Sequence, residues 1–245
     1  EHARDLAVNH KVTRDSRFLS PAFPNIEEDR RFLLQAYKAI NEDVKSRQPL
    51  VPASEWLLDN FYVIEEQIKE IENNFSNKIL AGLPVLLTGH YKGLPRVYWL
   101  AIEMIAHTEG IINDEVVTRF IRAFQSEVSL TSAELWSIPY MLRIGLIKNI
   151  RKIALHIVEA QEQRKSADKW SERFLDSIQR SQEELQKTID EFDKSTGVME
   201  SAFVERLLQR LRDQGGEASP ILRWLDEKLA DQDMIAESVI QSEHH

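Results

Sequence analysis

The sequence contains no cysteine, which excludes disulfide bonds, thiol nucleophiles and zinc sites built on cysteine. It also contains little glycine and proline, with eight of each in 245 residues. A β-rich protein of this length needs more turn residues, so their scarcity favours helices. The longest uncharged run, residues 79–91, is too short to cross a bilayer.

Positive charge is also in short supply, because 31 Lys and Arg residues face 40 Asp and Glu residues, for a net charge of −9. Nonspecific nucleic-acid binding needs a basic surface that displaces counterions, and anionic lipid attracts basic segments. We therefore expect no nucleic-acid partner and no membrane contact through this chain. With 42% apolar and 29% charged residues, the composition is that of a soluble globular protein.

Apolar residues recur at helical spacing along most of the chain. The clearest stripe lies in the helix expected from Pro52 and has alternating steps of four and three residues: Leu57, Phe61, Ile64, Ile68, Ile71 and Phe75. Asn25 and Asn113 are typical helix N-caps, and Thr131 with Glu134 forms a capping box. A nearly all-apolar helix is expected between Pro95 and Gly110. These signals predict an all-α array or bundle of roughly eight to ten helices, without a sheet.

The character of the chain changes near residue 161. The helix that starts at Thr131 is expected to run through Ile157 with a kink at Pro139, and beyond it the charge density rises. We therefore predict a helical core module over residues 1–160 and a more polar helical extension over 161–245, packed on the first. Residues 11–24 are expected to be a loop and 234–241 helical. The first ten residues have a helical pattern, so we expect a piece of a longer protein.

Three of the predicted helices carry polar and aromatic residues beside their apolar faces. The candidate residues are Trp56 and Asn60 on the first helix, Arg96, Tyr98, Trp99, Glu103 and His107 on the second, and Glu134, Trp136, Tyr140 and Arg143 on the third. We expect these three helices to meet, so that Trp56 and Asn60 face the other two sets.

Two interpretations of this polar cluster stay open. It is either a buried network of ion pairs and hydrogen bonds that joins helices, or a sugar site with Glu103 and His107 as an acid–base pair and aromatic rings as a platform. We favour packing, because buried charges need partners wherever they occur. No catalytic residue is assigned. No metal site is expected either, because the histidines lack the spacing of metal ligands.

Three segments resemble the N-terminal helical region of the cyclic β-1,2-glucan synthases, large bacterial proteins related to the cellobiose-phosphorylase-type glycosyltransferases. They are PASEWLLDNFYVIEEQI (52–68), LPRVYWLAIEMIAHTEG (94–110) and LTSAELWSIPYMLRIGLIKNI (130–150). A weaker resemblance continues through 202–214 and 221–232. The positions that match are Glu55, Trp56, Asn60, Arg96, Tyr98, Glu103, His107, Glu134, Trp136, Pro139 and Arg143.

The resemblance implies a parent enzyme that uses UDP-glucose to build a β-1,2-glucan and a phosphorylase-like domain that trims it. No catalytic motif of either domain has a match here, so this chain is expected to need no cofactor itself. The resemblance places it on the cytoplasmic side of the bacterial inner membrane, with the parent's other domains as expected partners and glucan as a candidate partner. Three functions follow as alternatives: a non-catalytic scaffold, a β-glucan-binding module, or an independent glycoside-active enzyme.

Overall fold

A computed structural model shows a helical protein. The structure describes residues 2–8, 10–45, 51–108, 110–195 and 199–230. These residues form ten α-helices, two short 3₁₀-helices and one two-stranded sheet, so the predicted all-α fold is confirmed. Contacts divide the chain into two compact units, Glu1–Leu155 (unit 1) and His156–His245 (unit 2). The helix predicted over 234–241 lies outside the described residues.

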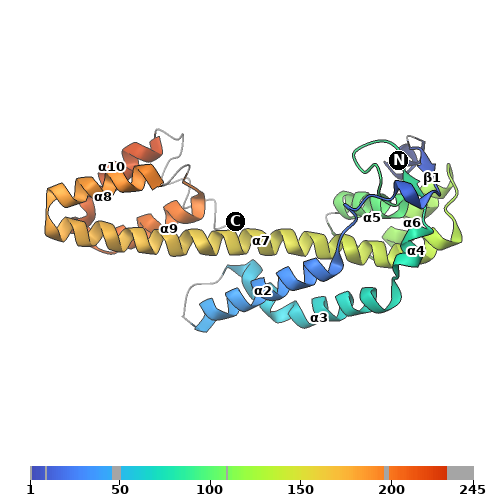
Figure 1. The fold of residues 1–245 in the computed structure, drawn as a ribbon, viewed down its shortest axis with the longest axis horizontal. Coiled ribbons are helices and arrows are strands. Elements are labelled where there is room, and N and C mark those ends of the chain that lie inside the picture. Colours follow the sequence, from blue (N-terminus) through green and yellow to red (C-terminus); the bar gives the residue numbers. More distant parts are fainter. Residues whose placement is uncertain (1, 9, 46–50, 109, 196–198, 231–245) are drawn as a thin grey trace. The chain divides into compact units, whose positions relative to one another are not determined.

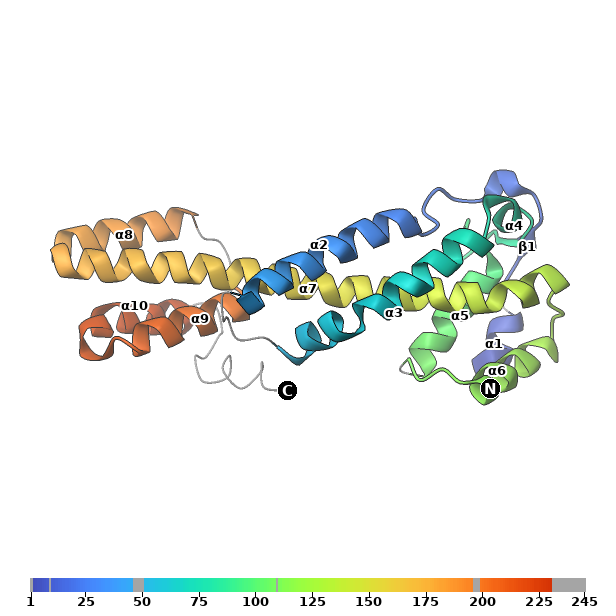
Figure 2. The same ribbon diagram turned by 90° about the horizontal axis from the view of Figure 1, so that it is seen from below.

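In unit 1, α2 (Ile26–Lys45) and α3 (Pro52–Asn74) lie side by side and run in opposite directions (Figures 1 and 2). The apolar stripe of α3 is buried as its spacing predicts, from Leu57 through Ile71. The rings of Tyr37 on α2 and Phe61 on α3 stack with centroids 4.4 Å apart. The predicted start of α2 is confirmed, because the Asn25 side chain accepts a hydrogen bond from the Glu28 amide at 3.2 Å.

The helix α5 (Arg96–His107) is largely buried, with seven of its twelve residues inside the protein. Its neighbour α6 (Asp114–Gln125) starts at Asn113, which accepts a hydrogen bond from the Val116 amide as predicted. The short α1 (His2–Val8) packs on α6. Because α5 is covered on several sides, the few polar side chains on it must find partners inside the protein.

The helix α7 (Ser132–Arg180) is unbroken over 49 residues and continues through Pro139. It therefore contributes residues to both units, and the division between them falls within it. Gly145 lets α5 approach α7 closely, since a Cβ atom there would lie 2.7 Å from Cδ1 of Ile105.

The prediction of no sheet needs a small correction. Two residues of the expected loop, Val12–Thr13 (β1), pair antiparallel with Val85–Leu86 (β2), which follows α4 (Asn77–Ala81). The segments that follow the two strands are also joined, because the Gly93 carbonyl accepts a hydrogen bond from the Ser20 amide at 2.7 Å. The φ of Gly93 is 86°. Strands of two residues have no readable period, and their pairing depends on distant parts of the chain.

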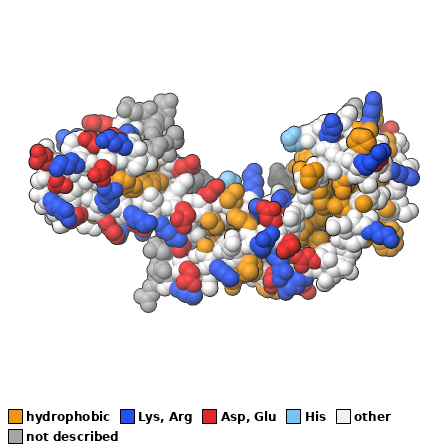
Figure 3. All heavy atoms as spheres, viewed as in Figure 1, with side chains coloured by type: hydrophobic (Ala, Val, Ile, Leu, Met, Phe, Trp, Pro, Cys, Tyr) orange, Lys and Arg blue, Asp and Glu red, His pale blue; other side chains and the backbone are white. Residues whose placement is uncertain are grey.

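Unit 2 consists of the last part of α7 with α8 (Gln182–Ser195), α9 (Ser201–Arg212) and α10 (Ser219–Ala230). Its core consists mainly of aliphatic side chains around a small group of aromatic rings: the rings of Phe174 and Phe192 lie 5.6 Å apart, and Trp224 is within 5.7 Å of both. In Figure 3, charged side chains of both signs cover most of the visible face of unit 2, whereas hydrophobic side chains gather over the part of unit 1 that holds α5.

Candidate functional site

The predicted polar stripe of α5 is the centre of a connected set of contacts in unit 1. At its first residue, Arg96 is 4% exposed and forms a two-pronged ion pair with Glu134 of α7, which is fully buried. Nε donates to Oε1 and Nη2 to Oε2, both at 2.8 Å. This fork geometry is the strongest form of an arginine–carboxylate pair and fixes orientation as well as distance. Two of the predicted cluster residues are thus brought together, and they tie α5 to α7.

Glu134 also completes the capping box that the sequence predicts at the start of α7. Its Oε2 accepts hydrogen bonds from the amide of Thr131 at 2.9 Å and from the Thr131 hydroxyl at 3.0 Å. The Thr131 hydroxyl in turn accepts from the Glu134 amide at 3.3 Å. A carboxylate in the first turn is further stabilised by the helix dipole. One side chain therefore caps α7 and neutralises the buried guanidinium of α5.

The remaining donors of Arg96 reach two further partners. Nη2 donates to the carbonyl of Ser129 at 3.3 Å, and Nη1 lies 3.3 Å from Nε2 of His10. The guanidinium carbon also lies 5.8 Å from the ring centroid of Phe124 on α6. The buried charge of Arg96 is thus neutralised by Glu134, and its other donors have hydrogen-bond partners, as a buried ion requires.

Further along the stripe, the pairing differs from the predicted acid–base pair. Glu103 accepts a hydrogen bond from the Trp99 indole at 3.1 Å, and its other oxygen lies 3.3 Å from Nε2 of His2 on α1. His107 instead stacks its ring on His2, with centroids 4.9 Å apart. The polar stripe of α5 thus consists of Arg96, Trp99, Glu103 and His107, and each of them contacts a neighbouring side chain. The sequence did not reveal that α1 is one of the partners.

Tyr98 lies apart from this stripe, on another side of α5. It is 6% exposed and meets Phe23 edge to face at 5.3 Å. Burial first, and then the charges of the nearby Tyr91 and Asp29, raise the pKa of the Tyr98 hydroxyl to about 12. A phenol held neutral in this way cannot act as a base at ordinary pH.

The residues expected on α7 divide into a contact group and an exposed ring. Arg143 donates through Nε to the Gln67 side chain of α3 at 2.7 Å and lies 3.5 Å from Glu70. Tyr140 is 5.5 Å from Phe75, and the Arg143 guanidinium lies over its ring at 5.8 Å. Trp136 is 80% exposed. This set joins α3 to α7 but does not reach the α5 stripe through any of these contacts.

The expectation that Trp56 and Asn60 face the other two sets is not met. Trp56 is 51% exposed, and the Asn60 amide donates to the Trp56 carbonyl of its own helix at 2.8 Å. The reason is the orientation of α3: it meets α7 through Gln67 and Glu70, whereas Trp56 lies some three turns nearer the N-terminus. Helical spacing defines a face, but it does not state which neighbour covers which turn.

Sequence reasoning missed one buried charge, Asp29 in the first turn of α2. It is fully buried, and its Oδ1 accepts hydrogen bonds from Lys148 at 3.1 Å and Arg151 at 2.5 Å, both on α7. Its Oδ2 has no hydrogen-bond partner among the described residues. Lys148 and Arg151 share a face of α7 at i, i+3 spacing, but such cations are also stable in water, so no local signal identified Asp29 as their partner.

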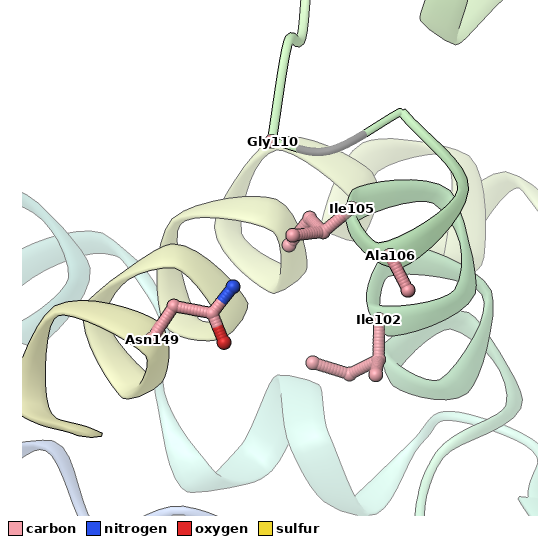
Figure 4. A pocket seen from close by; sticks show the side chains of 5 residues that line it. All are labelled: Ile102, Ile105, Ala106, Gly110 and Asn149. Atoms are coloured by element: carbon pink, nitrogen blue, oxygen red, sulfur yellow. The ribbon is translucent and has the colours of Figure 1, made fainter. Parts of the chain in front are cut away.

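A shallow pocket lies between α5 and α7 (Figure 4). It has a volume of about 260 Å³ and is lined by Ile102, Ile105, Ala106, Gly110 and Asn149. Figure 4 shows Asn149 facing the isoleucines across the opening. The lining offers one amide and no ionisable side chain, so it provides no acid, base or nucleophile.

No group of three or more His, Asp or Glu side chains among the described residues is arranged to hold a metal ion. None of the helices in those residues combines the length and the apolar character needed to cross a membrane.

Comparison with known proteins bears on the resemblance. No protein-family model matches the sequence. The chain is 31% identical over 193 residues to cyclic beta-(1,2)-glucan synthase NdvB of Rhizobium meliloti (strain 1021). The match covers 79% of this chain and 7% of that synthase, so the chain corresponds to a small part of its relative. The resemblance to the cyclic β-1,2-glucan synthases is therefore confirmed.

Proposed function

We propose that this chain is a non-catalytic helical module of a cyclic β-1,2-glucan synthase-like protein and that it serves as a scaffold for the catalytic domains. Similarity to the Rhizobium synthase supports a role connected with glucan synthesis. The scaffold role is supported by one observation above all: the ionic groups of the candidate site are bound to each other. Arg96 and Glu134 are buried in a two-pronged pair, whereas a glycosidase needs carboxylates that flank an open cleft.

The test has two arms. The first incubates this chain with UDP-glucose or with β-1,2-glucan. We expect no new product, because the pocket between α5 and α7 is lined by no acid or base among the described residues; product formation would contradict the non-catalytic role. The second deletes the matching segment from the Rhizobium synthase. We expect loss of assembled, active synthase, and restoration when the segment is supplied as a separate chain. An active deletion variant would overturn the scaffold role.

The proposal extends to the parent protein. In it, UDP-glucose is the sugar donor of the other domains, and this module lies on the cytoplasmic side of the bacterial inner membrane. The acidic composition of this chain fits a position away from the anionic lipid surface. Protease treatment of membrane vesicles tests the placement: an antibody against this segment should detect cleavage in inside-out vesicles and protection in right-side-out vesicles.

A second candidate function is β-glucan binding, and the exposure of Trp136 favours it. The Trp136 indole is 80% exposed and follows the same face of α7 as Tyr140 and Arg143, at i, i+4 and i, i+7 spacing, so it offers a flat apolar face and a hydrogen-bond donor to a sugar. Calorimetry with β-1,2-glucan oligomers should then show binding that Trp136→Ala abolishes. Trp56→Ala, at another exposed tryptophan on α3, is the matched control and should leave affinity unchanged. Absence of heat at millimolar ligand would remove this candidate.

A further inference from the structure

His10 occupies a position at which one ring joins three helices. It follows α1, and its Nδ1 lies 2.9 Å from the carbonyl oxygen of Leu6. Its Nε2 lies 3.3 Å from Nη1 of Arg96 on α5. The ring stacks on Phe124 of α6 with centroids 5.7 Å apart and tilts against Trp99 at 5.4 Å. The connection from α1 to the buried Arg96–Glu134 pair therefore passes through this imidazole.

These two contacts determine which nitrogen carries the proton. A carbonyl oxygen can only accept, so Nδ1 must be the donor toward Leu6. A guanidinium can only donate, so Nε2 must present its lone pair to Arg96. Both contacts are satisfied only by the neutral ring with its hydrogen on Nδ1. A second proton can enter only at Nε2, where it would point at a positive charge.

The groups around His10 do not compensate for that proton. Arg96 and Trp99 face it from α5, Phe124 from α6 and the Leu6 carbonyl from α1. Glu134 attracts the proton by its charge from the start of α7, but its oxygens already accept from Arg96 and Thr131. Another contact of α1, between His2 and Glu103, lies at the opposite end of the helix from His10.

We propose that His10 is a pH-sensitive latch: as a neutral ring it holds α1 against α5 and α6, and protonation at Nε2 releases α1. Release uncovers the α5 stripe, because His2 and His10 lie directly on Trp99, Glu103 and His107. The Arg96–Glu134 pair joins α5 to α7 without α1 and persists after release.

The direction of the pH response follows from the surroundings of the ring. Burial is the largest cause that lowers the pKa of His10 below its ordinary value of 6.5, and the Arg96 charge acts in the same sense. The undocked segment binds the proton more readily than the docked one, so docking is complete above the ordinary pKa and weakens as pH falls through it. The opening constant of α1 rises about tenfold if the docked and free pKa values differ by one.

Nuclear magnetic resonance of the full chain tests the latch directly. Imidazole ¹⁵N shifts, recorded from about pH 8 to pH 5, should show His10 with its hydrogen on Nδ1 and a midpoint below the ordinary histidine value. Over the same range, amide exchange of residues 2–8, corrected for its intrinsic pH dependence, should accelerate. A hydrogen on Nε2 at neutral pH, or a midpoint at or above the ordinary value, would overturn the proposal.

Variants separate His10 from the other histidines near α1. His10→Asn keeps an N–H donor for Leu6 and cannot titrate, so the acceleration at low pH should disappear. The double variant His2→Gln/His107→Gln removes the stacked pair of rings and should retain the acceleration of amide exchange at low pH. His90→Gln, at an exposed loop position, is the matched control and should behave as the parent chain. If the double variant loses the response and His10→Asn retains it, the switch lies elsewhere and the proposal is wrong.

Discussion

The two units of this protein hold their helices together by different chemistry. Unit 1 buries three charged side chains, Asp29, Arg96 and Glu134. The polar residues that are buried among the described part of unit 2 are all neutral: Gln161, Ser171 and Ser177. Its core is apolar and consists of aliphatic side chains packed around the touching rings of Phe174 and Phe192. Buried ion pairs add little net stability but favour one arrangement, whereas aromatic packing stabilises a core with less demand on geometry.

Each unit contains an arginine–carboxylate ion pair, and the two pairs differ in their exposure to water. In unit 1, Arg96 and Glu134 have side-chain exposures of 5% and 0%; in unit 2, Arg206 and Asp168 form a similar fork at 15% and 26%. The Coulombic attraction and the penalty for leaving one partner alone both grow as water is excluded. Equal changes in the two pairs should therefore have unequal effects.

The largest effect is expected from Arg96→Leu, which leaves the Glu134 carboxylate buried without its partner. The loss in free energy of unfolding of unit 1 should be about 3–5 kcal/mol. Urea titration followed by hydrogen exchange of peptides from α5 and from unit 2 measures it in each unit separately. The double variant Arg96→Leu/Glu134→Leu should recover much of the loss, because no charge is then stranded. Equal destabilisation by the single and double variants would contradict this account.

A smaller effect is expected from Gly145→Ala, which tests packing in unit 1 without touching a charge. The added Cβ meets the Ile105 and Ile102 side-chain tips at 2.7 and 3.0 Å, so these tips must move. The loss should be about 1–3 kcal/mol, since overpacking is relieved only in part. Thermal unfolding measures it, and Gly145→Ala combined with Ile105→Val should be milder than the single variant. No loss at all would show that α5 and α7 adjust freely.

Asp168→Ala in unit 2 is the counterpart of the Arg96 variant and should have less effect. Its partners Arg206 and Arg210 are partly exposed, so water replaces much of the interaction. We expect about 1 kcal/mol or less from the same urea titration, reduced further by added salt. A loss as large as that of Arg96→Leu would erase the difference drawn between the two units.

The smallest effect is expected from Asn60→Ala on α3. Among the described residues, the Asn60 amide donates to the carbonyl of Trp56 on its own helix, and alanine is the better helix former. The free energy of unfolding should change by less than about 0.5 kcal/mol in either direction. Circular dichroism during urea titration is sufficient to measure it. A loss of several times that size would show that Asn60 is bound inside the protein.

Local signals in the sequence predicted most of the helices. The caps at Asn25, Asn113 and Thr131 and the stripe from Leu57 to Ile71 depend only on residues within a few turns, and all are confirmed. The all-α class follows from them. The predicted boundary between residues 160 and 161 and the packing of the extension on the core stay predictions.

The partners of the polar residues could not be predicted, because they depend on how helices distant in sequence are rotated and placed. Arg96 and Glu134 were both recognised as candidates, but their pairing joins positions 38 residues apart. Asp29 was not among the candidates, and its partners Lys148 and Arg151 lie 119 and 122 residues away in the sequence. His10 was missed because it lies just beyond a short helix and carries no recognisable motif. Each of these contacts can be identified only once the packing of the helices is known.

The capping box at the start of α7 has a consequence for the order of events during synthesis. Arg96 leaves the ribosome 38 residues before Glu134, and α5 can form while α7 is still absent. When Glu134 emerges, the same carboxylate both closes the first turn of the 49-residue helix and binds a guanidinium already waiting. Nucleation is the slow, unfavourable step of helix formation. Arg96, which is made earlier, is thus available to bind the first turn of the longest described helix as that turn forms.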